Sequence, residues 1–487
     1  MNQDVMNLEP KALWTNFEAL NAVPRPSKKE EKVIAFLLDF AKEHGIEAFQ
    51  DKIGNIIMKK PASAGMENRQ TVVLQSHIDM VCQKNADTDF DFDTQGIQSF
   101  IDCEWVKAKG TTLGADNGIG VATMMTVLAD KSLVHGPIEC LYTIDEETGM
   151  TGAFGLESGL LDATILLNLD TEDEGELTIG CAGGVDTTVT ATYDQEELPA
   201  GYKSFRLSLR GLKGGHSGGE IHLGRGNANK LMNRLLWLTN KTYGLLVSEI
   251  EGGSLRNAIP RESFAVVSVL ANKAADFKQH VAEMEAIFKS EYSKADPLVE
   301  IAVEEVNNPA QVMTAKFQEQ LLNAIQACPN GVIRMSNDIE GLVETSTNLA
   351  QVNIKDGQFE VLTLQRSSVD TAKDDIARSV GAPFRLMGCK VVHEGSYPGW
   401  APNPSSAVLK EMESLFEKQF GRAAVVNAVH AGLECGIIGE AYPGLDMVSF
   451  GPTIKNPHSP DEMVEIGTVT RFYDYLLAIL KDIPVKG

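Results

Sequence analysis

Residues 71–80 have the sequence TVVLQSHIDM. Its first half is a short run of β-branched and apolar residues, which predicts a buried strand over residues 71–75. A histidine and an aspartate, His77 and Asp79, follow at the point where this strand ends. In sheets built from strands that alternate with helices, ligands collect at the carboxyl ends of the strands. The stretch therefore predicts an α/β fold with a functional site beside His77.

Strands and helices alternate on both sides of this stretch. Apolar runs predict strands over residues 55–58, 138–144 and 164–168 and a helix over residues 117–130. Ser27 is followed by Glu30, a capping-box pattern from which we expect a helix that ends near Gly45. The order of these elements indicates an α/β catalytic domain with a mostly parallel sheet flanked by helices.

The pattern changes after Gly184. Strand-like runs now interleave with amphipathic helices, and Lys355-Asp356-Gly357 predicts a hairpin turn. A stretch rich in proline and glycine closes this part, and helices of the α/β type follow it. We therefore expect a discontinuous catalytic domain, residues 1–184 and 400–487, with residues 185–399 inserted as a two-lobed α+β lid domain.

The overall composition restricts the class of protein. A chain of 487 residues is long enough for two domains, and none of its apolar runs is long enough to span a bilayer. The formal net charge of −24 disfavours nucleic acid as a partner, because phosphate backbones are also negative. Seven scattered cysteines without a CxxC pair, and an N-terminus without a signal-peptide pattern, favour a reducing compartment. We expect a cytoplasmic protein with no nucleic-acid or membrane partner.

Four further segments carry side chains that can bind metal, each next to a predicted strand or helix or in a proline-rich loop. The residues are Asp116, Glu146, Glu147, Asp170 and His458. Because the carboxyl ends of parallel strands share one edge of a sheet, these side chains are expected to meet His77 there. Two imidazoles and three carboxylates suit Zn²⁺, and Mn²⁺ or Co²⁺ can use the same ligands.

The adjacent glutamates Glu146 and Glu147 allow a division of roles. Two cations about 3.5–4 Å apart need a bridging carboxylate and acidify a water, whose proton a free carboxylate nearby can take. One glutamate can therefore bind metal while its neighbour acts as the general base. Asp79, two residues from His77, is placed to orient that imidazole.

Each of these residues also has a purely structural interpretation. A Glu-Glu pair is usually a solvated surface, Asp116 can cap a helix, and Asp170 can open an acidic loop. A histidine after a strand or among prolines is more often structural than a ligand. The joint pattern of position, order and ligand type favours a metal site over these separate interpretations.

The motifs as a set resemble a known family. They are SHIDMV at residues 76–81, LGADNGIG at 113–120, DEETG at 145–149, NLD at 168–170 and NPHS at 456–459. They are similar to the motifs of the di-zinc metallopeptidase family that includes carnosinase, tripeptidase T and succinyl-diaminopimelate desuccinylase. The resemblance covers essentially the whole chain and is greatest to the bacterial dipeptidases of that family. It implies a hydrolase with two Zn²⁺ per subunit.

The resemblance also implies a role for each residue. Asp116 bridges the metals, His77 and Asp170 complete one site, and Glu147 and His458 complete the other. Glu146 is the general base, and Asp79 orients His77. The bridging aspartate of this family often precedes a cis peptide bond, which implies one between Asp116 and Asn117.

The inserted segment carries three further candidates. The resemblance implies that His216, in the glycine-rich stretch 214–219, stabilises the oxyanion and that Asn257 is the lid asparagine. Arg366 is a candidate clamp for the substrate's C-terminal carboxylate, because a guanidinium matches a carboxylate with two hydrogen bonds. Without the resemblance, a flexible loop and a surface ion pair are the simpler interpretations of His216 and Arg366.

The returning catalytic segment adds one residue with two open interpretations. Glu434 can hold the free amino group of a dipeptide, or it can be a buried structural carboxylate. In relatives with a small lid, the lid histidine and asparagine reach across a dimer. The long insertion of this chain can supply them within one chain, and a homodimer through another surface stays open.

Two classes of function follow from the residues and the resemblance. The first is hydrolysis of unblocked dipeptides, Xaa-His included, with tripeptidase, carboxypeptidase or N-acyl-amino-acid deacylase activity as alternatives that use the same chemistry. The second is a non-catalytic metal-binding scaffold on the same fold. The chain has every predicted ligand and the base, and this favours the enzyme.

Overall fold

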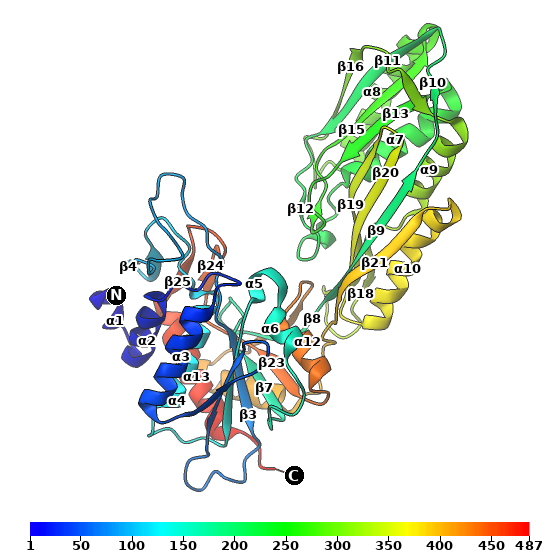
Figure 1. Ribbon diagram of the computed structural model, residues 1–487. Helices are drawn as coiled ribbons and strands as arrows, with labels where there is room; N and C mark the ends of the chain where they lie inside the picture. Colours follow the sequence, from blue (N-terminus) through cyan, green and yellow to red (C-terminus); the bar gives the residue numbers. More distant parts are fainter. Residues whose placement is uncertain (487) are drawn as a thin grey trace. The chain divides into compact units, whose positions relative to one another are not determined.

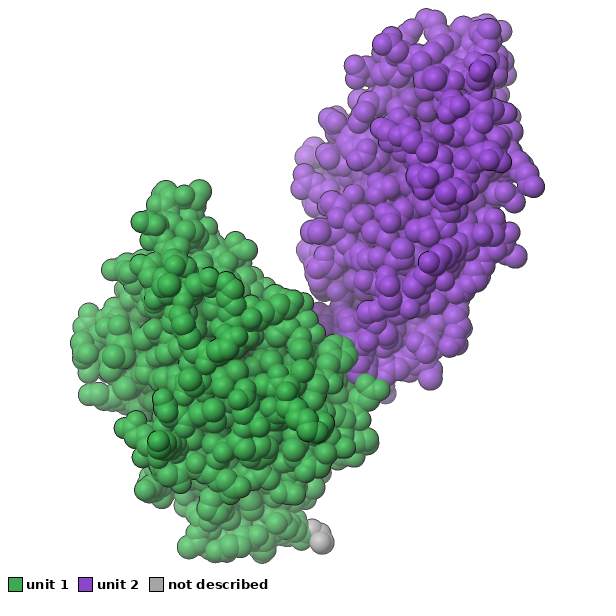
Figure 2. Space-filling model, viewed as in Figure 1, with its two compact units in different colours: residues 1–180, 402–428, 433–487 green, residues 181–401, 429–432 purple. Residues whose placement is uncertain are grey.

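The computed structural model describes residues 1–486. The chain folds into two compact units (Figure 2). Unit 1 comprises residues 1–180, 402–428 and 433–487, and unit 2 comprises residues 181–401 and 429–432. Unit 2 is therefore an insertion into unit 1, and each unit has its own sheet and its own core.

Unit 1 is built on an eight-stranded sheet with the strand order β1-β2-β6-β3-β7-β23-β8-β22 (Figure 1). The strands are β1 Glu47–Gln50, β2 Ile56–Lys60, β3 Val72–His77, β6 Ile138–Thr143, β7 Ile165–Asn168, β8 Glu176–Cys181, β22 Val425–Val429 and β23 Asp446–Ser449. The four central strands, β6, β3, β7 and β23, run parallel, while β2 and β8 pair antiparallel with their neighbours. Every residue of β3, β6 and β7 is buried, which explains their continuous apolar character. The parallel centre expected from the sequence is present, with antiparallel strands at its edges.

Helices pack on this sheet and on one another. They are α1 Gln3–Met6, α2 Lys11–Asn21, α3 Glu31–His44, α4 Ala115–Ala129, α5 Glu146–Gly149, α6 Thr151–Gly155, α11 Ala407–Phe420, α12 Glu434–Ala441 and α13 Ile466–Asp482. Helix α4 contacts β3 and α2, while α11 contacts β23 and α13. Every residue of α4 from Ala115 to Leu128 is buried, so small and apolar side chains cover all of its faces. This burial holds the start of α4, which carries Asp116, next to the end of β3.

The helix expected after Ser27 is α3, and Gly45 is its C-cap in the left-handed conformation (φ 69°). The predicted capping box is wrong, because Glu30 occupies the N-cap position and makes no side-chain cap bond. The Ser27 hydroxyl instead donates to Oδ2 of Asp79 at 2.8 Å. A tertiary partner thus replaces the local one that the pattern predicts.

A second, antiparallel sheet of unit 1 has the strand order β24-β25-β5-β4. Its strands are β4 Ser99–Asp102, β5 Trp105–Ala108, β24 Ile454–Lys455 and β25 Met463–Glu465. Strands β24 and β25 pair with each other, and the loop between them contains His458 and Glu462. The short hairpin therefore anchors both ends of this loop.

The main sheet of unit 2 has the strand order β16-β11-β15-β13-β19-β20-β9-β21, to which β18 adds by pairing with β19. Two small two-stranded sheets accompany it, one formed by β10 Gln195–Glu197 and β17 Gln311–Met313 and the other by β12 Gly215–His216 and β14 Ala258–Ile259. The strands are β9 Gly183–Thr192, β11 Tyr202–Arg210, β13 Leu246–Gly252, β15 Ser263–Leu270, β16 Glu300–Val306, β18 Gly331–Met335, β19 Val343–Lys355, β20 Gln358–Ser367 and β21 Lys390–Tyr397. The helices are α7 Ala228–Tyr243, α8 Ala274–Glu291, α9 Ala315–Ala327 and α10 Asp370–Leu386. Neighbouring helices contact one another in the order α8, α7, α9, α10 and share one hydrophobic core with the sheet.

The two halves of the insertion meet inside this sheet. Strand β13 of the first half pairs antiparallel with β19 of the second half, where Ile250 lies opposite Ile354. The predicted turn joins β19 to β20, and its central residues Asp356 and Gly357 have φ angles of 51° and 75°. A two-residue hairpin loop with positive φ at both positions matches the right-handed twist of its strands. Both expected lobes are thus parts of one α+β sheet domain.

Candidate metal and catalytic site

The carboxyl edge of the parallel strands collects the predicted ligands of unit 1. His77 is the last residue of β3, Glu146 and Glu147 follow the end of β6, and Asp170 follows β7. These three strands are neighbours in the sheet, so their ends lie side by side. The placement at strand ends that the sequence predicts is present in the structure.

Asp116 lies between the two imidazoles of the site. Its Oδ1 is 3.1 Å from Nε2 of His77, and its Oδ2 is 3.1 Å from Nε2 of His458. It sits at the kinked start of α4, and the peptide bond between Asp116 and Asn117 is cis, as the family resemblance implied. A carboxylate that turns one oxygen toward each imidazole has the arrangement that a bridging ligand needs.

Two groups of three residues share Asp116. In the first, Nε2 of His77 lies 3.5 Å from Oδ1 of Asp170. In the second, Nε2 of His458 lies 3.0 Å from Oε2 of Glu147. Within each group the ligand atoms lie within 4.8 Å of one another. These groups are the two ligand sets that the resemblance assigned to the two metals.

The electrostatics of these groups are those of a site that holds positive charge. Hydrogen bonds to Asp116 and Glu147 raise the pKa of His458 to about 11. Burial opposes the charged form of His77, yet Asp170 and Asp116 raise the pKa of this imidazole well above its usual range. Burial likewise opposes the charge of Asp116, but its bonds to the two imidazoles hold its pKa well below the usual range. Without a metal, protons on the imidazoles therefore balance the carboxylates.

Metal binding is consequently expected to weaken as pH falls. An imidazole with a raised pKa keeps its proton over the neutral range, and that proton must leave before the nitrogen can bind a cation. Between about pH 6 and 9, the apparent Kd is expected to rise about tenfold per unit of pH decrease for each proton released. Calorimetry in two buffers of different ionisation enthalpy measures the protons released. A Kd that does not change with pH, with no proton release, would contradict this assignment of the ligands.

Asp79 connects two parts of the site. Its Oδ1 lies 3.3 Å from Nδ1 of His77 and accepts the backbone N–H of Glu146 at 3.1 Å. Its Oδ2 accepts the N–H of Glu147 at 3.2 Å and the hydroxyl of Ser27. Asp79 is fully buried, so one carboxylate faces the His77 ring and holds the backbone of both glutamates.

Glu146 lies among the other charged groups. One of its carboxylate oxygens forms a third group with ligand atoms of His77 and Glu147, again within 4.8 Å. Burial, followed by the carboxylates of Asp170 and Glu434, raises the pKa of Glu146 well above its usual range. A carboxylate with a raised pKa is suited to accept a proton at neutral pH. Glu146 is close enough to take a proton or to bind metal, and the variants described in the Discussion separate these roles.

Glu434 begins helix α12 and is buried beside polar side chains of β3 and β6. Its Oε2 accepts hydrogen bonds from Nε2 of Gln75 at 2.6 Å and from the hydroxyl of Thr143 at 2.7 Å. Its Oε1 is buried and has no hydrogen-bond partner among the described residues, and burial raises the pKa of this carboxyl to about 7. An unpartnered carboxylate oxygen in a buried position is suited to a cationic donor such as an amine.

The predicted lid residues His216 and Asn257 lie next to each other in unit 2. Strand β12, Gly215–His216, pairs with β14, Ala258–Ile259, and the N–H of Ser217 donates to the carbonyl of Asn257 at 2.8 Å. Nδ1 of His216 accepts the N–H groups of the two glycines at 218 and 219, at 3.3 and 3.1 Å. The proton of the neutral ring must then be on Nε2, which leaves that atom as a hydrogen-bond donor.

Arg366 is a buried residue of unit 2 and does not have the exposure of a residue in a surface ion pair. Nη1 of Arg366 donates to the hydroxyl of Tyr397 at 2.8 Å, and its Nε has no partner in the part of the chain that the structure describes. Ser346 lies opposite Arg366 on the adjacent strand, and its hydroxyl is 2.7 Å from Nε2 of His430. Burial, with the charge of Arg366 nearby, lowers the pKa of His430 to about 3, so this imidazole is neutral. A buried guanidinium with unused donors is suited to bind an anion.

Sequence analysis missed two buried charged residues of the site, Arg25 and Glu462. Both are at most 2% exposed, and each makes several hydrogen bonds to the backbone that carries the predicted ligands. No local pattern marks them, since Arg25 lies between two prolines and Glu462 lies in an acidic loop. Such positions normally indicate solvent exposure.

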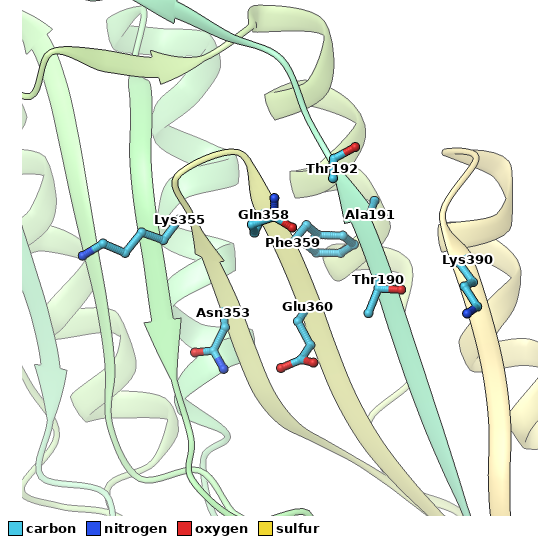
Figure 3. Close-up of a pocket in the computed structure, with 9 residues that line it drawn as sticks. All are labelled: Thr190, Ala191, Thr192, Asn353, Lys355, Gln358, Phe359, Glu360 and Lys390. Atoms are coloured by element: carbon cyan, nitrogen blue, oxygen red, sulfur yellow. The ribbon is translucent and has the colours of Figure 1, made fainter.

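Unit 2 also has an open pocket of about 610 Å³ (Figure 3). Neighbouring strands contribute Thr190, Asn353 and Glu360 to its lining, and Lys355 and Lys390 add amines. None of the predicted site residues lines it, and its side chains do not form a set of metal ligands. The pocket is therefore separate from the metal chemistry.

Comparisons with known proteins identify the family of the chain. Residues 207–296 match the family model described as a peptidase dimerisation domain. The cytosol non-specific dipeptidase of Escherichia coli (strain K12) is 46% identical over 483 residues, which cover 99% of this chain and 100% of that protein.

Solved structures are similar to this chain in sequence or in fold. Aminoacylhistidine dipeptidase from Vibrio alginolyticus is 47% identical and superimposes with a TM-score of 0.94 over 99% of both chains. Aminopeptidase PepT from Bacillus cereus, at 16% identity and a TM-score of 0.54 over 98% of this chain and 99% of that one, shares the fold. Because the identity to the E. coli protein extends over the whole of both chains, this chain belongs to the metallopeptidase family of the cytosol non-specific and aminoacylhistidine dipeptidases.

Proposed function

We propose that this protein is a metallo-dipeptidase that hydrolyses unblocked dipeptides, Xaa-His among them, with Glu146 as the general base. The observation that carries the proposal is the position of Asp116, which faces His77 with one oxygen and His458 with the other. The identity to the E. coli and Vibrio alginolyticus dipeptidases supports the substrate class.

The residues at this site fit two divalent cations. His77, Asp116 and Asp170 would hold one ion, and Asp116, Glu147 and His458 would hold the other. Within residues 1–486, Oε1 of Glu147 is buried without a partner, as expected for an oxygen that binds a metal ion. Mixed imidazole and carboxylate ligands support Zn²⁺ as the metal, with Mn²⁺ or Co²⁺ as substitutes.

The protein's own groups would carry the proton through the reaction. When bound, the two cations supply Lewis-acid chemistry and acidify the attacking water. The Glu146 carboxylate accepts a proton from that water and returns it to the amine that leaves. Asp79 accepts the backbone N–H of Glu146 and faces the ring of His77, so it would fix the position of the base relative to this ligand.

Unit 2 would stabilise the negative charge that develops on the substrate carbonyl. Nε2–H of His216 is the free donor left by the two backbone bonds at Nδ1. Burial, followed by the charge of Arg366, lowers the pKa of His216 and so keeps the imidazole neutral. The contact between Ser217 and Asn257 places the lid asparagine beside it. A donor held in advance at this position is worth several kcal/mol to the transition state, on the order of 2.7–4.

Two buried groups would recognise the ends of a dipeptide. Glu434, with one free carboxylate oxygen, is the acceptor for the free amino group. Arg366, with an unpartnered Nε, is the donor for the C-terminal carboxylate. Recognition of both charged ends limits the substrate to unblocked peptides.

Replacing Arg366 by alanine is expected to raise KM for a free dipeptide by about 10- to 100-fold, the range for a lost charge-assisted hydrogen bond of 1.5–3 kcal/mol. For the same dipeptide with an amidated C-terminus, KM should rise much less, because this substrate has no C-terminal carboxylate for Arg366 to bind. Steady-state kinetics on the matched pair of substrates measures the difference. Arg366→Lys, which keeps the charge and loses the planar fork, is the control variant. An equal effect of Arg366→Ala on both substrates would exclude the clamp.

The proposed function is tested with a substrate panel on the metal-loaded protein. Ala-His and β-alanyl-His should be cleaved, while tripeptides and N-acetyl amino acids should react much more slowly. Removal of the metal with a chelator should abolish turnover, and added Zn²⁺ should restore it. Failure to cleave any unblocked dipeptide, with two metal equivalents bound, would favour the deacylase or carboxypeptidase alternatives. Absence of tightly bound metal would favour the scaffold.

A cytoplasmic location and a homodimer complete the proposal. The name of the E. coli relative supports the location. The match of residues 207–296 to a peptidase dimerisation domain supports the homodimer. Within residues 1–486, no helix is long and apolar enough to cross a membrane. Sedimentation of the purified protein distinguishes the dimer from a monomer.

A further inference from the structure

Glu462 receives four successive backbone N–H groups of the segment that leads to Asp116. Its Oε2 accepts the N–H of Leu113 at 2.7 Å and that of Gly114 at 2.9 Å. Its Oε1 accepts the N–H of Ala115 at 2.7 Å and that of Asp116 itself at 3.2 Å. One buried carboxylate thus fixes every peptide N–H from the residue before Gly114 to the central carboxylate of the site.

Arg25 holds the same segment through its carbonyl side. Nη2 of Arg25 donates to the carbonyl of Gly114 at 2.6 Å, and Nη1 donates to the carbonyls of Ile78 and Asp79 at 3.3 and 3.0 Å. The guanidinium therefore links the end of β3, which carries His77, to the segment that carries Asp116. Gly114 has a φ of 70°, and a Cβ at this position would collide with Nη2 of Arg25, so only glycine leaves room for the link.

Glu462 also belongs to the loop that carries His458. The N–H of Glu462 donates to the carbonyl of Ser459 at 3.0 Å, and the N–H of Asp461 donates to the Ser459 hydroxyl at 3.1 Å. These bonds close a turn between His458 and Glu462. A displacement of Glu462 would therefore move two ligands at once, His458 through the turn and Asp116 through its backbone.

We propose that Glu462 and Arg25 are positioning residues that hold Asp116, His77 and His458 at the spacing that two cations sharing one carboxylate require. The inference rests on the proposed ligand set and adds to it the residues that fix its geometry. Hydrogen bonds between a charged group and the backbone are stronger than neutral ones and tolerate little displacement. Loss of an outer partner of metal ligands typically costs about 10- to 100-fold in metal affinity.

The chain offers a matched control for a merely structural role. Glu139 is also a buried carboxylate of unit 1 that accepts backbone N–H groups, those of Asp162 and Ala163, at 2.9 to 3.1 Å. It lies in β6, near the strand end away from His77 and Asp116. Removing its charge disturbs a buried hydrogen-bonded carboxylate at the end of the sheet opposite the proposed ligands.

The experiment compares Glu462→Gln and Glu139→Gln by titration of the metal-free proteins with Zn²⁺ against a competing chelator. Glutamine keeps the shape of the side chain but turns an NH₂ group toward N–H donors. Thermal melts of the metal-free proteins set a temperature at which each protein is folded. We expect Glu462→Gln to weaken the binding of both metal equivalents by about 10- to 100-fold and Glu139→Gln to leave it within about twofold. If Glu462→Gln does not fold, Arg25→Lys takes its place. This variant is also expected to bind both metal equivalents more weakly.

Two results would overturn the inference. One is a Glu462→Gln protein, or its Arg25→Lys replacement, that binds both metals as tightly as the unaltered chain. The other is an equal loss of affinity in Glu139→Gln, which would mean that any buried carboxylate has this effect. Tight binding in both the unaltered chain and the variant rejects this inference and leaves the proposed function standing. An unaltered chain that binds no metal rejects both.

Discussion

Replacing Glu146 by glutamine is expected to lower kcat by roughly 100- to 10,000-fold while both metal equivalents stay bound. The substitution keeps the size of a side chain whose burial and acidic neighbours raise its pKa well above the usual range. It removes the ability to accept a proton and leaves the groups that share Asp116 intact. The measurement is the initial rate on an unblocked dipeptide, together with metal analysis of the same sample.

The adjacent residue provides the control for this experiment. Glu147→Gln alters an oxygen that lies 3.0 Å from Nε2 of His458, so this variant is expected to lose metal as well as activity. A comparable loss of metal in Glu146→Gln and Glu147→Gln would mean that the proposed division between base and ligand is wrong. Full activity of Glu146→Gln would mean that Glu146 is not the general base.

His216→Ala is expected to reduce kcat by roughly 100- to 1,000-fold, with a small change in KM. The free Nε2–H of His216 is proposed to bond the carbonyl oxygen only when it has gained negative charge, so its loss acts on the transition state. Metal content should not change, because His216 lies in unit 2 and the predicted ligands lie in unit 1.

His222→Ala is the matched control for the lid. His222 is an exposed histidine in the short 3₁₀ helix Ile221–Leu223, close in sequence to His216. Its removal should leave kcat and KM close to those of the unaltered protein. An unchanged kcat in His216→Ala, or an equal loss in His222→Ala, would exclude the oxyanion role of His216.

The centre of the site could be predicted from sequence because its signals are local. Strand β3 is an apolar run with His77 at its end, and the motif around Asp116 begins a helix that is buried from Ala115 to Leu128. Strands of this kind align their carboxyl ends, so the meeting of His77, Glu147 and Asp170 follows from the fold class. The hairpin at Asp356-Gly357 was predictable for the same reason, since the turn depends on its own residues.

The supporting residues could not be predicted because their partners are distant in the chain. Glu462 accepts N–H groups from residues that precede it by 346 to 349 positions. Ser27 shows the opposite error, since its local pattern predicts a helix cap but its hydroxyl bonds Asp79, 52 positions away. Local patterns thus mark the candidate ligands, whereas the groups that hold these residues in place depend on tertiary contacts.

Asp116 is proposed to bind two cations at once. Crystals grown with Zn²⁺ and measured on both sides of the zinc absorption edge test it directly. We expect two anomalous peaks about 3.5–4 Å apart, one on each side of the Asp116 carboxylate. One peak should have His77 and Asp170 as its other ligands, and the second should have Glu147 and His458. A single peak, or peaks whose ligands do not include Asp116, would contradict the account.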